Sequence, residues 1–461
     1  MQRVICFIIF SCLITLTACQ AAEKPGPLSY SLTLDQAIDY ALKENRTYDN
    51  AKMSIKSAEL SYRAVQKEWL PKFTTNYSYD RTFSDLTFSA SAPDINDPNL
   101  MDTYSISFPQ DNYMWTTWFS MPLFSASLDT QVTIARLGID VAKVRLIQAK
   151  NELVANIKLY YYTVLRDQRF IEFLYQNLKS YEELERLNDQ YHRQGLVAMN
   201  SVLEARVEKA NAEQELANSI RNADVSLATL KTAMSMDITR NITIEDMPEK
   251  AVFDLTFLQC IEAAKKQNPE LIAFQFLKSQ GELAVKLEKT EYTPSLNLSA
   301  YYMTYGDTPG MQPVPGIPGS LLTGMLSLNW MFFDWGKKAD EAKIKQVELD
   351  QLRNNEKLTY DRVVLRIKEA YSQLRTAERN METAKIAIVS ARENLRISKL
   401  RYQQQVAPQK EVIDALTNLK RAEYNYQSAF YAYHIAVAGL DQAMGKDTAR
   451  IIESQKGDVR K

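Results

Sequence analysis

The sequence predicts a mixed α and β membrane protein with a tandem structural repeat. Two features point to this fold class: long stretches in which apolar or small residues recur with a seven-residue period, and four runs of about ten residues in which apolar and polar side chains alternate. A sustained heptad pattern is typical of coiled-coil helices. Alternating runs of this length are typical of transmembrane β-strands. Both features occur in each half of the 461-residue chain.

The start of the chain has the composition of a signal peptide. A positive charge precedes the apolar run 4–16, which is too short for a permanent transmembrane helix. The run ends in Leu-Thr-Ala before Cys19, which resembles the lipobox of bacterial lipoproteins. We therefore expect residues 1–18 to be a lipoprotein signal peptide and Cys19 to be lipidated; an ordinary signal peptide without lipidation is the alternative. Gln20 resembles the second residue of lipoproteins sorted to the outer membrane, where the acyl chains would anchor the protein in lipid.

Composition argues against several classes of function. The net charge is −1, so charge suggests no nucleic-acid partner. The chain has only two histidines, His192 and His434, and no clustered metal ligands, Gly-rich phosphate loop or nucleophile motif. We therefore expect no enzymatic activity, no cofactor and no metal site. With Cys19 acylated, Cys260 has no disulfide partner within the mature chain, and a small buried residue is its expected role.

The second half of the chain repeats the layout of the first. Three pairs of residues share one separation along the chain: Thr33 with Thr256, Asn45 with Asn268, and Pro71 with Pro294. Each half reads as short helix, helix, Pro, variable region, long helix, break, long helix, and the first half has the longer insertion after its Pro. We expect the first repeat at 19–253, the second at 254–446 and a polar C-terminal tail at 447–461.

Two pairs of long helices carry the heptad pattern. We expect them at about 126–190 and 201–236 in the first repeat, and at about 335–402 and 411–444 in the second. In the second pair, one of the two seam positions is almost always Ala, which lets helices approach closely. At 1.5 Å per residue, the longest helices measure on the order of 100 Å. A soluble helical bundle would carry the same heptads.

Four alternating runs are the expected strands, at about 73–83, 115–124, 295–305 and 324–333. Aromatic residues gather near their ends, as they do at the two interfaces of a membrane. A soluble hairpin with one buried face is the alternative. The connections 84–113 and 306–320 are polar or rich in Pro and Gly, so we expect exposed loops there.

Four strands from one chain cannot close a barrel. An open edge cannot lie in lipid, because its backbone groups would be unpaired. Other copies of the chain must therefore complete the sheet. Two copies would give eight strands, too narrow for a channel, whereas three copies give twelve. We therefore expect a homotrimer with four strands per chain.

The order of these features resembles that of the TolC-like outer membrane efflux proteins, the outer membrane factor lipoproteins, over essentially the whole mature chain. The resemblance rests on the segment 32–45, Glu270, Pro71, Pro294, Phe124, Phe333, the turns 195–197 and 401–402, and the segment 411–415. It implies a trimeric twelve-stranded outer membrane β-barrel, continued by a long periplasmic α-helical coiled-coil barrel. It also implies two protein partners, a periplasmic adaptor (membrane fusion) protein and an inner membrane pump.

The two helix breaks, at 191–200 and 402–410, are the expected functional site. Long hairpins would carry both breaks to the periplasmic end of the helical barrel. By resemblance, this end is the entrance of the channel, and its hairpin tips dock the adaptor. The residues expected to form the tips are Gly195, Leu196, Val197, Tyr402, Gln405 and Val406.

Glu411 and Asp414 are the candidate constriction residues. They follow the second break three positions apart, so they share a helix face. They resemble positions at which family members carry acidic rings. Three copies would concentrate about six negative charges at the narrowest point, an arrangement that selects cations. The alternative is that both carboxylates complement the dipole at a helix N-terminus.

Some positions depart from the family pattern. Gln405 stands where the family usually has Gly. Ala407 and Ser201 occupy the positions of an Arg–Asp pair that closes the entrance in some members, so that ion pair cannot form here. Tyr402 is retained and is a candidate to hydrogen-bond across the gap between the two hairpins.

The expected function is the outer membrane channel of a tripartite efflux system, a passive trimeric duct that exports small molecules from the periplasm or the pump to the exterior. Two alternatives remain open: a type I secretion duct for polypeptides, and a lipid-anchored periplasmic coiled-coil scaffold. The scaffold explains the heptads but not the four strands. We expect the protein in the cell outer membrane, lipid-anchored and extending into the periplasm.

Overall fold

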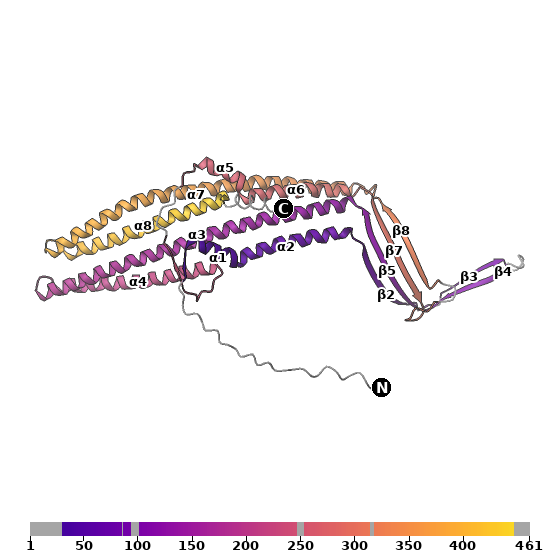
Figure 1. Cartoon of the computed structure of the whole chain (residues 1–461), viewed down its shortest axis with the longest axis horizontal. Coiled ribbons are helices and arrows are strands. Elements are labelled where there is room, and N and C mark those ends of the chain that lie inside the picture. Colours follow the sequence, from indigo (N-terminus) through magenta and orange to yellow (C-terminus); the bar gives the residue numbers. More distant parts are fainter. Residues whose placement is uncertain (1–29, 85, 94–100, 247–252, 314–317, 447–461) are drawn as a thin grey trace, which may run out of the picture.

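The computed structural model describes residues 30–84, 86–93, 101–246, 253–313 and 318–446. The molecule is elongated, with a curved bundle of helices at one end and a β-sheet at the other (Figure 1). The expected signal peptide 1–18, the expected lipidation site Cys19 and the expected tail 447–461 lie outside the described residues.

A short helix begins each half, and both short helices start with the same cap. In α1 (Leu34–Glu44), the Thr33 hydroxyl accepts from the Gln36 backbone N–H at 3.3 Å, and the Gln36 side chain accepts from the Thr33 N–H at 3.1 Å. The same capping box starts α5 (Phe257–Gln267) at Thr256. A capping box satisfies two of the N–H groups that a helix start leaves unpaired.

Asn45 and Asn268 have equivalent roles in the two halves. They cap the second helix of each half, α2 (Arg46–Gln66) and α6 (Pro269–Thr290). Asn45 Nδ2 donates to the Ala233 carbonyl at 2.8 Å, and Asn268 Nδ2 donates to the Ala443 carbonyl at 2.9 Å. Each Asn therefore ties the start of a second helix to the end of a long helix in its own half.

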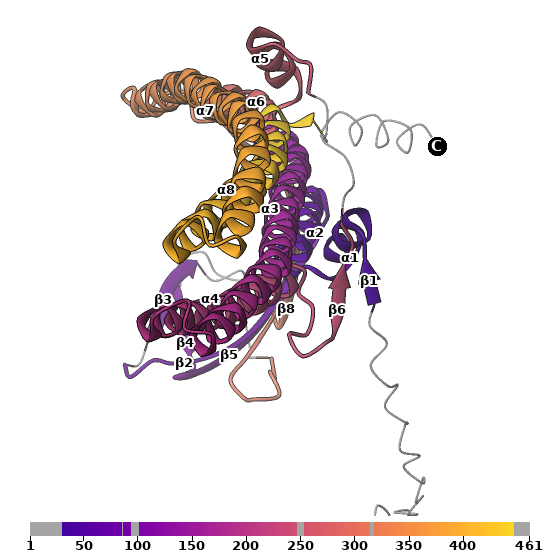
Figure 2. The same cartoon turned by 90° about the vertical axis from the view of Figure 1, so that its left-hand side faces the viewer.

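Four long helices form most of the molecule: α3 (Ala126–Arg193), α4 (Met199–Ala233), α7 (Lys337–Gln403) and α8 (Gln409–Met444). α3 has 68 residues and α7 has 67, so each is about 100 Å long at 1.5 Å per residue. α3 packs against α4 and α8, and α7 packs against α8. Viewed end-on, these helices form a curved wall that is open on one side (Figure 2). No helix in the described part of the chain is both long enough and apolar enough to cross a bilayer.

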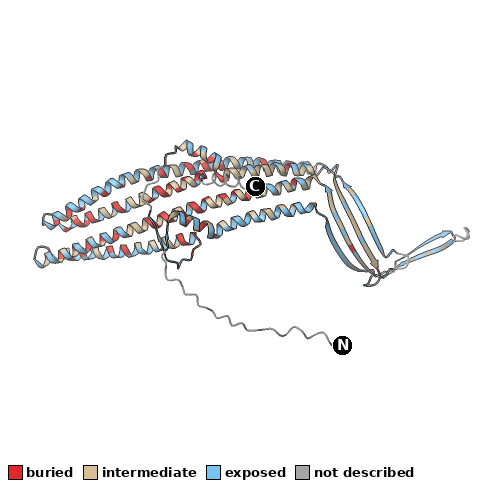
Figure 3. Cartoon of the chain, in the orientation of Figure 1, coloured by how far each residue is buried: buried red, intermediate tan, exposed pale blue. Residues whose placement is uncertain are grey.

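Most heptad positions of the predicted seam are buried, although Met381 is only half-buried and α8 also buries Leu416 and Tyr431 outside that seam. Ile367 and Leu374 of α7 are buried, as are Ala415 and Leu440 of α8. Figure 3 places the buried residues mainly in the helices, whereas the sheet is mostly exposed or intermediate. Cys260 is buried in the same core as Ile367 and Leu440, as expected, and burial raises the pKa of its thiol.

The four expected strands form one antiparallel sheet: β2 (Lys72–Arg81), β5 (Asp111–Phe124), β7 (Ser295–Gly306) and β8 (Ser320–Asn329), in the order β2-β5-β7-β8. A 3₁₀ turn, η1 (Lys67–Trp69), precedes β2. β8 begins and ends four residues earlier than the predicted 324–333. Asn329 pairs with Ser295, the first residue of β7, so residues 330–333 run past the last pairing partner. Within the described residues, the outer edges of β2 and β8 have no strand partner.

Two further strand pairs correct the sequence analysis. The predicted exposed loop 84–113 contains a hairpin, β3 (Leu86–Pro93) paired with β4 (Met101–Phe108). β3 is rich in Ser and Ala, and this weak strand propensity hid its alternation, whereas β4 contains Thr, Tyr, Ile and Phe, which favour strands. β1 (Tyr30–Leu32) and β6 (Ile242–Ile244) form a parallel pair of three residues each, too short to leave a sequence pattern.

The two faces of the four-stranded sheet differ in polarity, as the alternation predicts. Phe73 of β2, Phe119 and Trp115 of β5, and Leu322 of β8 share one face by register. In the single chain, Phe73 is 70% exposed and Leu322 is 74% exposed. Ser, Thr and Asn are frequent on the opposite face. A face of this apolarity requires an apolar environment, and its length and alternation match those of a transmembrane strand set.

Candidate functional site

The two expected tips are turns of the same design. α3 ends at Arg193, and Gly195 follows with φ +74°; α7 ends at Gln403, and Gln405 follows with φ +61°. In the first turn, the N–H of Gly195 donates to the His192 carbonyl at 2.9 Å, and the N–H of Leu196 donates to the Tyr191 carbonyl at 2.9 Å. These are the two bonds of a Schellman motif, which closes the C-terminus of a helix.

The second turn repeats these bonds without a glycine. The N–H of Gln405 donates to the Tyr402 carbonyl, and the N–H of Val406 donates to the Arg401 carbonyl, both at 2.9 Å. A left-handed φ is strained for a residue with a Cβ and costs on the order of 1 kcal/mol. Gln405 therefore keeps the turn geometry seen at Gly195 and carries a backbone strain that Gly195 avoids.

Apolar side chains are exposed at both tips. Leu196 is 50% exposed and Val406 is 67% exposed, and Met199 beside the first turn is also exposed. Val197 is half-buried, and its carbonyl lies 3.1 Å from His192 Nδ1. The structure therefore places Gly195, Leu196, Gln405 and Val406 in two exposed turns, each at the end of a helical hairpin (Figure 1), whereas the predicted tip residue Tyr402 is buried.

The hairpins α3–α4 and α7–α8 are joined by hydrogen bonds close to their tips. Tyr402 of α7 donates a hydrogen bond from its hydroxyl to the Asn188 side-chain oxygen on α3, which confirms that Tyr402 bonds across the gap. Asn188 is fully buried, and burial raises the pKa of Tyr402 to about 12. Tyr191 adds a second link, because its hydroxyl donates to the Gln403 carbonyl at 3.1 Å. The rings of Tyr191 and Tyr402 lie 5.9 Å apart.

Two further links join the hairpins farther from the tips. Lys399 Nζ lies 3.3 Å from the Ser180 hydroxyl oxygen, and burial lowers the pKa of this lysine. Lys420 of α8 forms an ion pair with Glu215 of α4 at 2.8 Å. An apolar core that includes Leu184 and Leu416 fills the space between the hairpins. No local sequence pattern marks these links, because each joins segments about two hundred residues apart.

The two candidate constriction carboxylates lie at the start of α8, each beside a cation of its own chain. Glu411 forms an ion pair with Arg401 at 2.6 Å, and Asp414 lies 3.5 Å from Lys410 Nζ. Asp414 is the more exposed carboxylate of the two. The single chain therefore compensates much of the charge at Glu411 and leaves Asp414 open to solvent.

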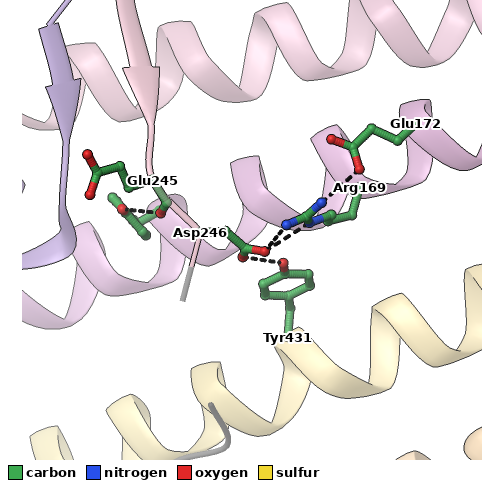
Figure 4. Close-up of polar contacts among 6 residues, drawn as sticks. Arg169, Glu172, Glu245, Asp246 and Tyr431 are labelled. Atoms are coloured by element: carbon green, nitrogen blue, oxygen red, sulfur yellow. Dashed lines mark hydrogen bonds and ion pairs between the residues drawn. The ribbon is translucent and has the colours of Figure 1, made fainter. Parts of the chain in front are cut away.

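A second polar cluster lies midway along the helices (Figure 4). Asp246, just after β6, accepts from Arg169 Nε of α3 at 2.9 Å and from the Tyr431 hydroxyl of α8 at 3.1 Å. Arg169 also donates to Glu172 at 2.8 Å, and its two carboxylate partners raise the pKa of its guanidinium. Burial, and then the negative charge of Asp246, raise the pKa of Tyr431. One carboxylate therefore connects helices from the two halves of the chain.

The β1–β6 pair is hydrogen-bonded to α3 beside this polar cluster. The Tyr161 hydroxyl of α3 donates to the backbone carbonyls of Leu32 and Glu245, at 3.0 and 2.6 Å. No sequence signal identified this cluster, because its members come from four separate segments. Among the described residues, no group of three or more His, Cys, Asp or Glu side chains could hold a metal ion.

Comparisons with known proteins give one family and one fold. The family model described as "Outer membrane efflux protein" matches residues 37–235 and 260–446, one match in each half. Protein CyaE of Bordetella pertussis is 25% identical over 212 residues, which cover 46% of this chain and 44% of that protein. The match therefore spans less than half the length of that relative.

Solved structures similar to this chain include outer membrane proteins and channels. The chain is similar to the Campylobacter jejuni CmeC outer membrane channel, with a TM-score of 0.73 and 17% identity over 91% of this chain and 88% of that one. It is also similar to the outer membrane protein VceC of Vibrio cholerae, with a TM-score of 0.70 and 15% identity over 89% of this chain and 96% of that one. At these identities the similarity establishes the fold.

Proposed function

Since the chain belongs to the outer membrane efflux protein family, we propose that it is the outer membrane channel of a tripartite efflux system. It is a passive trimeric duct, and it carries small molecules from the periplasm or an inner membrane pump to the exterior. Membership of an efflux family means that the protein is a transport protein and not an enzyme, as the sequence analysis expected.

One observation carries the proposal: in a single chain the sheet has unpaired edges and the wall of helices is open on one side (Figure 2). The sheet has an apolar face, and within the described residues its outer edges on β2 and β8 are unpaired. Unpaired backbone groups cannot lie in lipid. Three copies joined edge to edge give a closed barrel of twelve strands. Figure 2 shows the curved wall of helices of one chain, and in this proposal three such walls join into a tube.

The proposed repeat explains why one chain supplies two similar helical hairpins, α3–α4 and α7–α8. Asn45 and Asn268 cap equivalent helices and bond to equivalent carbonyls, which supports a tandem duplication at 19–253 and 254–446. Each repeat then contributes two strands and one long helical hairpin, and a trimer contains six such units.

The joined hairpin tips form the periplasmic entrance of the duct. We infer that the bond between Tyr402 and Asn188 holds each pair of tips together in place of the missing Arg–Asp pair. The exposed apolar residues Leu196 and Val406 suit a protein partner, and a periplasmic adaptor is the proposed occupant. Separation of the tips opens the entrance when the adaptor and the pump engage.

Glu411 and Asp414 set the charge at the constriction, in this proposal. Arg401 pairs with Glu411 at 2.6 Å, whereas Lys410 lies 3.5 Å from the more exposed Asp414, so Asp414 contributes more of the cation preference than Glu411 does. Cys19 anchors the chain through its acyl groups in the outer membrane, while the helical tube extends into the periplasm.

Cell fractionation with gel migration tests the proposal. We expect the protein in the outer membrane fraction, and we expect a trimer band that converts to the monomer on heating. Cells that lack the protein should accumulate more ethidium, and the native gene should restore export. A monomeric protein in the soluble periplasm, with unchanged ethidium accumulation, would favour the coiled-coil scaffold instead.

A further inference from the structure

An aromatic pair lies on the polar face of the sheet. Trp118 of β5 is directly opposite Tyr301 of β7. The two ring centroids are 4.7 Å apart, and the ring planes are inclined by 36°. Thr74 of β2 and Thr323 of β8 complete this row across the four strands. The pair is therefore a tilted aromatic contact set between hydroxyl-bearing side chains.

Trp118 remains partly exposed although it belongs to a cross-strand aromatic pair. Cross-strand aromatic pairs stabilise sheets, and Phe73 and Phe119 form such a pair on the apolar face with centroids 5.3 Å apart. Trp118 is 43% exposed, on the face that the alternation assigns to water. No described residue accepts a hydrogen bond from its indole N–H. Both the ring face and the N–H remain available to a solute.

The surroundings of the pair select by stacking rather than by charge. The next row towards the hairpin β3–β4 contains Asn76, Thr116, Met303 and Leu321, none of which is charged. The row on the other side contains Lys72, whose ammonium group forms an ion pair with Glu68. A ligand at this row therefore contacts aromatic rings and uncharged side chains.

We propose that Trp118 and Tyr301 form a stacking site for planar aromatic solutes on the wall of the duct. This inference rests on the proposed function, which turns the polar face of the sheet towards the lumen. Stacking on aromatic side chains tolerates differences in chemical detail, and the ring faces also attract planar cations. Three copies repeat the site at one level of the barrel. A weak site of this kind retains a passing solute briefly and still releases it.

Proflavine, a planar aromatic cation, is the probe for the test. The full chain is purified in detergent micelles, and proflavine binding is followed by fluorescence polarisation. We expect Trp118→Ser and Tyr301→Ser each to weaken binding by about tenfold, the equivalent of about 1.4 kcal/mol for a lost stacking partner. Trp118→Phe keeps an aromatic ring and should retain most of the affinity. N-methylglucamine, a cation without a ring, should not compete with proflavine for binding to any of these proteins.

Current blockades by proflavine in planar bilayers provide the second readout. We expect blockades of the native channel to last several-fold longer than those of Trp118→Ser. Native affinity in both serine variants would overturn the stacking site while leaving the channel intact. Conversely, a native chain that binds proflavine at Trp118 but forms no channel would overturn the proposed function and place the site on a different surface. Equal loss of affinity in Trp118→Phe and Trp118→Ser would also contradict stacking.

Discussion

The hydrogen bond from Tyr402 to Asn188 makes a direct prediction about the closed entrance. Replacing Tyr402 with Phe removes only the hydroxyl and keeps the ring that packs beside Tyr191. The Asn188 side-chain oxygen then loses its donor, although this residue is fully buried and water cannot replace the bond. The tips of the two hairpins should separate more readily in Tyr402→Phe.

The burial of Asn188 sets the expected size of the shift towards separated tips. A buried polar group left unpaired costs about 1–3 kcal/mol, and 1.4 kcal/mol is a factor of about ten in an equilibrium. We therefore expect the balance between joined and separated tips to shift by roughly tenfold in each chain. Burial raises the pKa of Tyr402 to about 12. The hydrogen bond of the protonated Tyr402 hydroxyl stabilises the joined tips fully below the ordinary tyrosine pKa of about 10, and this stabilisation is lost as the pH rises through about 12. The effect of the bond on the entrance should therefore be constant between about pH 6 and 9.

Single-channel recording in planar bilayers measures the effect. We expect Tyr402→Phe to have longer or larger openings than the native channel. Tyr191→Phe is the matched control, because its hydroxyl bonds to the Gln403 carbonyl at an exposed residue, where water can substitute. A smaller effect is expected in this control. If Tyr402→Phe and Tyr191→Phe both conduct as the native channel does, the buried bond does not hold the entrance.

Four further predictions test separate parts of the structure. Gln405→Gly should raise the unfolding free energy by about 1 kcal/mol in denaturant titrations, because it relieves a left-handed φ; an unchanged value would contradict that strain. Leu374→Asp should abolish stable trimers on heat-modifiable gels, because a buried unpaired charge costs several kcal/mol; normal trimers would contradict a role for this buried seam in assembly. Combining Glu411→Gln with Asp414→Asn should weaken cation preference in reversal potentials measured across a salt gradient, and an unchanged potential would favour the helix-dipole role. Cys19→Ala should abolish metabolic palmitate labelling and leave the barrel assembled, whereas undiminished label would refute lipidation.

Local periodicity was sufficient to predict the long helices and the large strands. A buried seam must recur along the helix, so the positions of Leu374 and Leu440 are visible as heptads. Strand alternation has the same origin, because one side of the sheet is apolar. The residues at which the strands end were less predictable. β8 ends at Asn329 because its partner β7 begins at Ser295, and a pairing limit of this kind leaves no mark in the strand itself.

The candidate site could be predicted only where its residues are close in sequence. The turns at Gly195 and Gln405 follow from local signals at the ends of helices. The partner of Tyr402 was not predictable, because Asn188 lies in the other hairpin and a buried Asn within a long helix has no distinctive pattern. The ion pair between Arg401 and Glu411 crosses the turn, so it depends on how the turn folds.

The most direct test of the central claim is the mass of the species that conducts. The full chain is purified in detergent, its mass is measured by native mass spectrometry, and the same sample is inserted into planar bilayers. We expect a complex of three chains that conducts ions in discrete steps. A conducting species with a different number of chains would contradict the barrel of twelve strands, and a three-chain complex that conducts no ions, even with Tyr402→Phe, would contradict the duct.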